Sequence, residues 1–94
     1  MKTDEELKEA AELDKRVKWL GARILKLESD LDVHRANRDN CRKMLEAYPD
    51  DKCAAAIVDE EEGQIKVKCF ELVDLREEYY KKIIRVADFV RNRQ

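Results

Sequence analysis

The side chains of this sequence best suited to a structural zinc site are one histidine and three cysteines: His34, Cys41, Cys53 and Cys69. A structural zinc site needs four ligands arranged as a tetrahedron, about 2.0 to 2.3 Å from the metal. On a helix His34 and Cys41 would stand about 10 Å apart along the axis, and the three cysteines lack the Cys-x-x-Cys spacing of zinc sites. The sequence therefore predicts no metal and no cofactor. It predicts free thiols, with Cys41 and Cys69 acting as small hydrophobic side chains.

Three arginines, Arg23, Arg38 and Arg76, allow a catalytic alternative. The all-helical chorismate mutases are chains of about this size, in which arginines and a lysine inside a helical dimer bind a dicarboxylate. The analogy covers size and helix content only, because the Arg and Lys pattern of that family's first helix is not matched here. The sequence also lacks a glycine-rich loop and a recognisable catalytic set. We therefore expect a protein that is not an enzyme, with a chorismate-mutase-like enzyme as the remote alternative.

Trp19 lies in a short basic segment, residues 15–26, that contains no acidic side chain. Such a segment could bind phosphates, but the whole chain has 20 Lys and Arg against 22 Asp and Glu and so has no basic excess. No run of residues approaches the roughly 18 apolar positions of a membrane span, and the N-terminal segment 1–12 is acidic. The sequence thus argues against nucleic acid and membranes as partners and predicts a cytoplasmic protein.

The composition indicates long helices, because 2 glycines and 1 proline supply few turns while 44% of residues are hydrophobic and 45% charged. The turn signal is Pro49, which disfavours helix at the preceding residue. Thr3 and Glu6 have the spacing of an N-terminal capping box. We expect one domain over 1–94, with a helix over about 3–47, a turn at 48–52 and a helix over about 53–92.

Apolar side chains in both halves recur at alternating steps of three and four, the heptad pattern of coiled coils. In the first half this seam comprises Ala10, Leu13, Val17, Leu20, Ile24, Leu27, Leu31, His34, Arg38, Cys41, Leu45 and Tyr48. In the second half it comprises Ala55, Val58, Glu62, Ile65, Cys69, Leu72, Arg76, Tyr79, Ile83, Val86 and Val90. Folding the chain back at the turn aligns the two seams. The predicted fold class is all-α, a long antiparallel helical hairpin resembling a coiled coil.

Polar residues interrupt both seams at corresponding places. Arg38 falls opposite Glu62, which predicts a partly buried ion pair that sets the register of the hairpin. Gly63 is a poor helix residue and marks a possible break, and residues 54–69 allow a short β-hairpin as an alternative.

More apolar side chains lie outside the seams than a two-helix hairpin can bury, and a chain of this size buries little surface alone. We therefore expect a homodimer in the form of a four-helix bundle, acting as a non-enzymatic assembly or adaptor subunit. The alternative is a small monomeric binder or inhibitor that docks its apolar stripe on a larger, different protein. The predicted interface residues are Trp19, Leu25, Phe70, Val73, Tyr80, Ile84 and Ala87.

Overall fold

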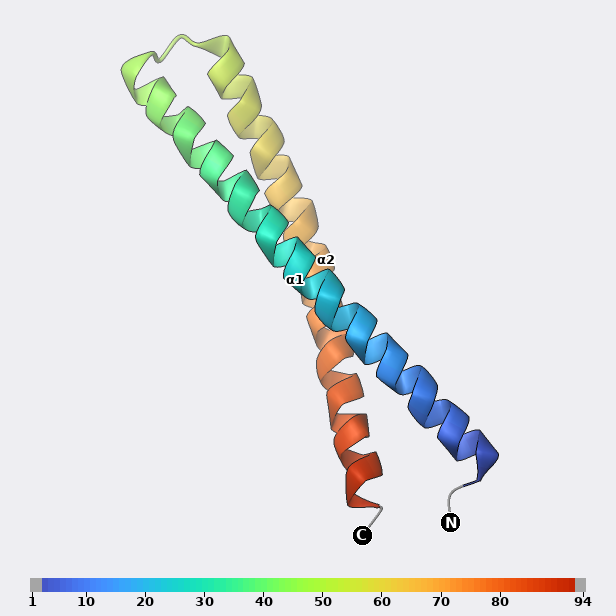
Figure 1. Cartoon of the computed structure of the whole chain (residues 1–94). Helices are drawn as coiled ribbons and strands as arrows, with labels where there is room; N and C mark the ends of the chain where they lie inside the picture. Colours follow the sequence, from blue (N-terminus) through green and yellow to red (C-terminus); the bar gives the residue numbers. More distant parts are fainter. Residues whose placement is uncertain (1–2, 93–94) are drawn as a thin grey trace. The chain divides into compact units, whose positions relative to one another are not determined.

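The structure, a computed structural model, describes residues 3–92 and contains two helices, α1 (Asp4–Ala47) and α2 (Lys52–Arg91) (Figure 1). No strand occurs among the described residues. The chain is therefore an all-α helical hairpin, which confirms the predicted fold class at this level. The ends of the predicted 1–94 domain, residues 1–2 and 93–94, lie outside the described residues.

The start of α1 is capped by Thr3. The Thr3 hydroxyl accepts a hydrogen bond from the amide of Glu6 at 3.3 Å, and the Thr3 carbonyl accepts one from the amide of Leu7 at 3.1 Å. The acidic side chains of the first turn, Asp4, Glu5 and Glu6, suit the positive end of the helix dipole. The hydroxyl bond is the Thr3 half of the predicted capping box.

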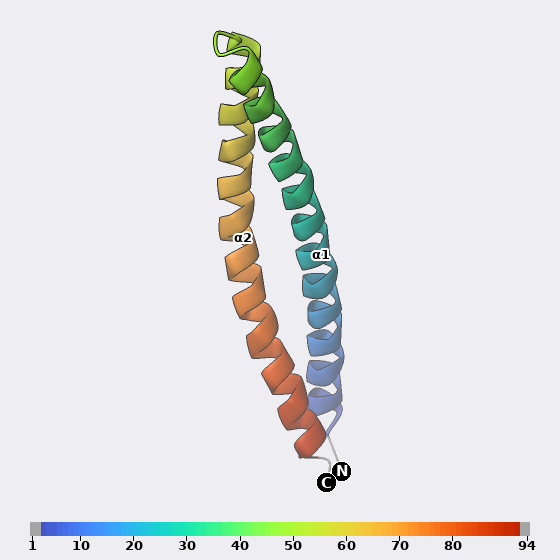
Figure 2. The ribbon, with the colours of Figure 1, turned by 90° about the vertical axis from the view of Figure 1, so that its left-hand side faces the viewer.

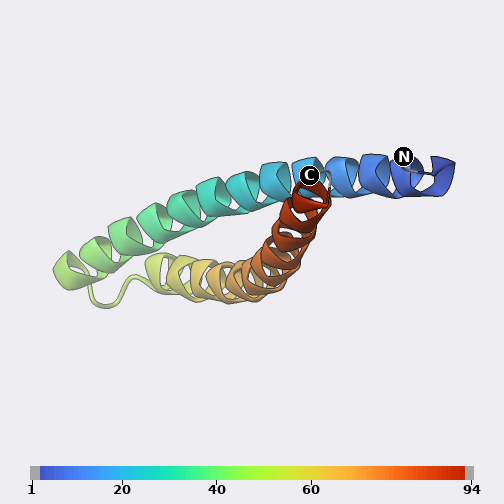
Figure 3. The same cartoon turned by 90° about the horizontal axis from the view of Figure 1, so that it is seen from below.

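The link between the helices, residues 48–51, is short (Figure 3). Hydrogen bonds cap the helix at each of its ends. At the end of α1 the amide of Tyr48 donates to the carbonyl of Met44 at 2.7 Å. At the start of α2 the Asp51 carboxylate accepts from the amides of Cys53 at 3.0 Å and Ala54 at 3.1 Å. Asp51 is therefore the N-cap of α2, where a carboxylate satisfies amides that have no partner inside the helix.

The helices contribute to two units. The terminal unit combines the described parts of Met1–Leu25 and Val73–Gln94, and the turn unit is Lys26–Leu72. In each unit a part of α1 lies antiparallel to a part of α2 (Figure 1 and Figure 2).

The hydrophobic core of each unit is a narrow layer between the two helices. Leu13 and Leu20 are buried in the terminal unit. Leu27, Leu31, Ala54 and Leu72 are buried in the turn unit. Along α1 the buried and half-buried positions include the predicted seam from Ala10 to Leu45, whereas Tyr48 is exposed.

The seam of α2 differs from the predicted one at every second position except Cys69, which is half-buried as predicted. Its buried and half-buried side chains include Ala54, Val58, Glu61, Ile65, Lys68, Leu72, Leu75, Tyr79, Lys82, Val86 and Phe89. The steps still alternate between four and three, and five positions, from Val58 to Val86, are shared with the prediction. At 68–69 both Lys68 and the predicted Cys69 are half-buried, and the remaining positions are shifted by one residue toward the N-terminus, so that Leu75 replaces Arg76 and Phe89 replaces Val90. The lysines fit because a lysine can bury its methylene stem while its amine stays in water.

Residues 54–69 are helical throughout, and α2 runs through Gly63 without a break. The alternative of a β-hairpin over these residues is therefore wrong. A two-stranded hairpin without further strands is only marginally stable, whereas the helix satisfies the backbone groups and buries Ala54 and half-buries Val58 and Ile65.

Candidate interaction surface

An apolar stripe on α2 in the terminal unit is the candidate functional surface. Val73, Tyr80 and Ile84 are 60%, 63% and 62% exposed, and Ala87 is exposed too. At 3.6 residues per turn these four side chains share one face of the helix, on the side away from the seam. We call Val73, Tyr80, Ile84 and Ala87 the α2 stripe.

Two apolar residues that sequence reasoning placed in the seam are exposed in the terminal unit. Ile83 is 39% and Val90 58% exposed, because the α2 seam runs through Lys82 and Phe89 instead. They extend the apolar surface beside the α2 stripe. The sequence does contain a signal for their exposure. Helix α2 carries a second heptad pattern, displaced by one residue toward the N-terminus, that leaves Ile83 and Val90 outside the seam.

The remaining predicted interface residues lie at three separate places. Phe70 belongs to the turn unit and is exposed, as is its neighbour Val67. Leu25 is exposed on α1 in the terminal unit. Trp19 is half exposed, and the guanidinium of Arg16 lies over its ring at 4.6 Å from the ring centroid. This cation–π contact covers part of the indole from within the chain.

Ion pairs join the two helices of the terminal unit. Arg16 donates to both carboxylate oxygens of Glu78, at 2.6 and 2.7 Å, and Arg85 pairs with Glu9. The hydrogen bond from Arg16 lowers the pKa of Glu78 below its usual range, and the same bond raises the pKa of Arg16. Bidentate arginine–carboxylate pairs fix orientation as well as distance, so this pair defines how α2 faces α1 here.

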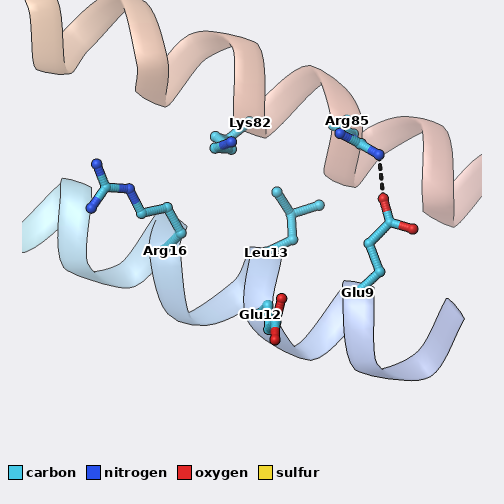
Figure 4. Close-up of a pocket in the computed structure, with 6 residues that line it drawn as sticks. All are labelled: Glu9, Glu12, Leu13, Arg16, Lys82 and Arg85. Carbon is cyan, nitrogen blue, oxygen red and sulfur yellow. Dashed lines mark hydrogen bonds and ion pairs between the residues drawn. The ribbon is translucent and has the colours of Figure 1, made fainter. Parts of the chain in front are cut away.

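A pocket of about 260 Å³ opens beside these ion pairs (Figure 4). Among the six side chains that line it, an ion pair joins only Glu9 and Arg85 (Figure 4). Arg16 is already engaged by Glu78 outside this set. The lining carries three cationic and two anionic side chains, and Glu78 balances the third cation by binding Arg16, so the pocket has no excess of charge for an ionic ligand. Its lining residues are Glu9, Glu12, Leu13, Arg16, Lys82 and Arg85.

In the turn unit the polar seam residues find partners that differ from the predicted ones. Glu62 pairs with Arg42, one helical turn beyond the predicted Arg38. Arg38 is half-buried, and its Nε donates to the neighbouring Asp39 at 3.1 Å. The physical reason is the shifted α2 seam. It places Glu61 and not Glu62 between the helices, so Glu62 lies at the edge, where a long arginine can reach it.

Glu61 takes the seam position and contacts the only histidine of the chain. The His34 Nδ1 and Glu61 carboxylate lie 2.5 Å apart, with side chains 22% and 16% exposed. A seam histidine bonded to a carboxylate is a satisfied polar contact, and it ties α1 to α2 within the turn unit.

The three cysteines are free thiols in the structure. Cys53 is exposed, and Cys41 and Cys69 are half-buried. The Sγ of Cys69 lies 4.0 Å from Nη2 of Arg35. Within residues 3–92 no three side chains of the His, Cys, Asp or Glu types are grouped so as to hold a metal ion.

The arginines of the catalytic alternative are distributed over both units. Arg38 belongs to the turn unit, and Arg23 and Arg76 belong to the terminal unit. None of these three lines the pocket described above.

Comparisons with protein-family models, curated proteins and solved structures find no match to this chain. Over the part of the chain that the structure describes, neither helix has a segment sufficiently long and apolar to cross a membrane.

Proposed function

We propose that this chain is a non-enzymatic interaction protein that self-associates through α2 and acts as an assembly or adaptor subunit. The observation that carries the proposal is the α2 stripe, whose three large side chains are each about 60% exposed. Fully burying a Val or Ile side chain contributes roughly 1.5 to 3 kcal/mol, and covering the exposed part of Val73 or Ile84 contributes a corresponding share of it. Two hairpins that associate through this face make a four-helix assembly.

The thin core of the terminal unit supports the proposal. Leu13 and Leu20 are its buried hydrophobic residues among those described, whereas Val73, Tyr80, Ile84 and Val90 remain exposed. Contiguous exposed apolar surface of this kind typically marks a contact with another protein. A contact along the α2 stripe would give the terminal unit a second buried layer.

Sedimentation equilibrium of the wild-type chain and of the double variant Val73→Glu/Ile84→Glu tests the proposal. Each glutamate would place an unpaired charge in a dry contact, so we expect self-association to weaken by at least about 100-fold. The control is Val33→Glu/Met44→Glu, which changes two side chains of similar exposure, 57% and 49%, in the turn unit.

Three results are informative. A wild-type dimer that the Val73/Ile84 variant dissociates and the control leaves intact supports the proposal. A variant that sediments as the wild type places the interface elsewhere. A wild-type chain that stays monomeric at high micromolar concentration overturns self-association and favours the monomeric binder.

A further inference from the structure

The charges beside the α2 stripe are divided between its two ends. The first half of the stripe is accompanied by Asp74 and Glu77, with Arg76 as the one opposing charge, whereas Glu78 is neutralised by Arg16 of α1. On the exposed side of α2 the second half is accompanied by the bases Lys81 and Arg91, with Asp88 as the one opposing charge. Within the terminal unit α2 therefore changes from acidic to basic near Tyr80.

From this division we infer that the α2 stripe binds the α2 stripe of a second copy in the antiparallel direction, with Asp74 of each copy facing Lys81 of the other. The inference rests on the proposed self-association and adds the partner element and its direction. A parallel arrangement would set acidic half against acidic half and basic half against basic half. The antiparallel arrangement sets unlike charges together at both ends.

The spacing of the stripe supports the same pairing. Val73, Glu77, Tyr80, Ile84 and Ala87 follow steps of four and three, so α2 carries a second heptad seam on this face. When two such seams pack antiparallel, Val73 lies against Ile84 of the second copy and Glu77 lies against Tyr80 of the second copy. The contact is isologous, so each pairing occurs twice.

Asp74 and Lys81 directly follow Val73 and Tyr80 and so lie on one flank of this seam. In the pairing that opposes Val73 and Ile84, the Asp74 flank of one helix meets the Lys81 flank of the other. Both side chains are exposed. They are therefore available for a contact between copies.

Glu77 is the one charged side chain within the seam. It is already paired with Lys81 of its own chain at 3.0 Å. A carboxylate that keeps a cation beside it is less costly to cover than an isolated one. Lys81 then bridges Glu77 of its own chain and Asp74 of the second copy.

Charge reversal at the two flanking positions tests the direction. We expect Asp74→Lys and Lys81→Asp each to weaken self-association about tenfold, because two attractive contacts become repulsive in the symmetric dimer. The double variant Asp74→Lys/Lys81→Asp restores opposite charges and should return to within about threefold of the wild type. The effects of the single variants should shrink as salt is raised from about 0.05 to 0.5 M.

Lys18→Asp is the matched control. Lys18 pairs with Asp14 four residues earlier at 2.9 Å, and these side chains are 77% and 61% exposed. The corresponding values for Lys81 and Glu77 are 3.0 Å, 73% and 63%. Lys18→Asp thus removes an equivalent intrahelical pair outside the α2 stripe, and self-association should be unchanged. Circular dichroism at the sedimentation concentrations verifies that each variant remains helical.

The outcomes separate this inference from the proposed function. The antiparallel pairing is overturned if the two single variants self-associate as strongly as Lys18→Asp. It is also overturned if the double variant loses as much association free energy as the two single variants together. If Val73→Glu/Ile84→Glu still dissociates the dimer in that case, self-association through the stripe stands with another direction or partner face. A monomeric wild-type chain overturns both.

Discussion

Arg16 binds Glu78 with two hydrogen bonds, from Nε at 2.6 Å and from Nη2 at 2.7 Å, although the two residues are 62 positions apart in the sequence. The same guanidinium covers one face of Trp19. One arginine therefore joins the two helices of the terminal unit and also holds an indole ring in place. Replacing Arg16 with lysine would keep the charge but lose the bidentate geometry.

This pair makes the stability of the terminal unit depend on pH. The hydrogen bond from Arg16 lowers the pKa of Glu78, so the carboxyl group of Glu78 binds its proton less tightly in the folded chain than in the unfolded chain. The pair's contribution is fully present above the ordinary glutamate pKa of about 4.3 and is lost as the pH falls through the lower folded pKa. We expect Glu78→Gln to have a lower thermal midpoint than the wild type at pH 7. At about pH 2, where the Glu78 carboxylate is protonated, the two thermal midpoints should be equal. Thermal unfolding between about pH 2 and 7 measures the difference.

Arg16→Met is the background that isolates this effect. In that background Glu78→Gln should change the thermal midpoint little at any pH, because the partner is already gone. A loss at pH 7 that persists in full in the Arg16→Met background would show that Glu78 acts through some other contact.

Leu20 and Leu25 offer a matched comparison of burial on one helix. Leu20 is fully buried and Leu25 is 68% exposed. We expect Leu20→Ala to lower the free energy of unfolding by about 2 to 5 kcal/mol and Leu25→Ala to change it by less than about 0.5 kcal/mol. Urea unfolding measures both. A large loss from Leu25→Ala would mean that something outside the chain's own fold covers this side chain.

Gly63 gives a test of helix continuity in the turn unit. It lies inside α2 without a positive φ, and a methyl group added there would have no neighbour within 4 Å. Gly63→Ala should therefore raise the free energy of unfolding by about 0.5 to 1 kcal/mol. If chemical denaturation instead shows a loss of stability, the backbone at this position is not helical in solution.

The partner of Glu62 can be decided by a double-mutant cycle. Arg42→Met and Glu62→Gln should be coupled by about 0.2 to 1 kcal/mol, the range of exposed ion pairs, because these side chains are 50% and 44% exposed. Arg38→Met and Glu62→Gln should be additive. If urea unfolding instead shows coupling between Arg38 and Glu62, these two side chains are in contact in solution and the register is the one that the sequence predicts.

The seam of α1 could be predicted because its apolar residues form one narrow stripe. Leu13, Leu20, Leu27 and Leu31 recur with heptad spacing, and few large apolar side chains stand beside them to offer a second solution. Helix α2 is apolar over a broader face. There two overlapping heptads share residues such as Leu72 and Val86, and spacing alone cannot choose between them.

The choice on α2 depends on how side chains use the space between the helices. The predicted seam takes Arg76 and Ile83, whereas the observed one takes Leu75 and Lys82. A lysine in the seam contradicts the binary pattern but costs little when its amine reaches water. The exposed α2 stripe was predictable because both heptads leave it outside. The Arg16–Glu78 pair was missed because it depends on the register of the two helices and on how far an arginine side chain extends. The spacing of apolar residues specifies neither.

The short capped link at residues 48–51 has a consequence for the entropy of closing the chain. Arg42 and Glu62 are 20 positions apart in the sequence, and Glu9 and Arg85 are 76 positions apart. Closing the longer loop directly from an open chain costs about 1 kcal/mol more than closing the shorter one. Once the turn unit has formed, only the parts of α1 and α2 that lie outside Lys26–Leu72 still have to be brought together. The capped turn therefore reduces the entropy that the most distant ion pair has to overcome.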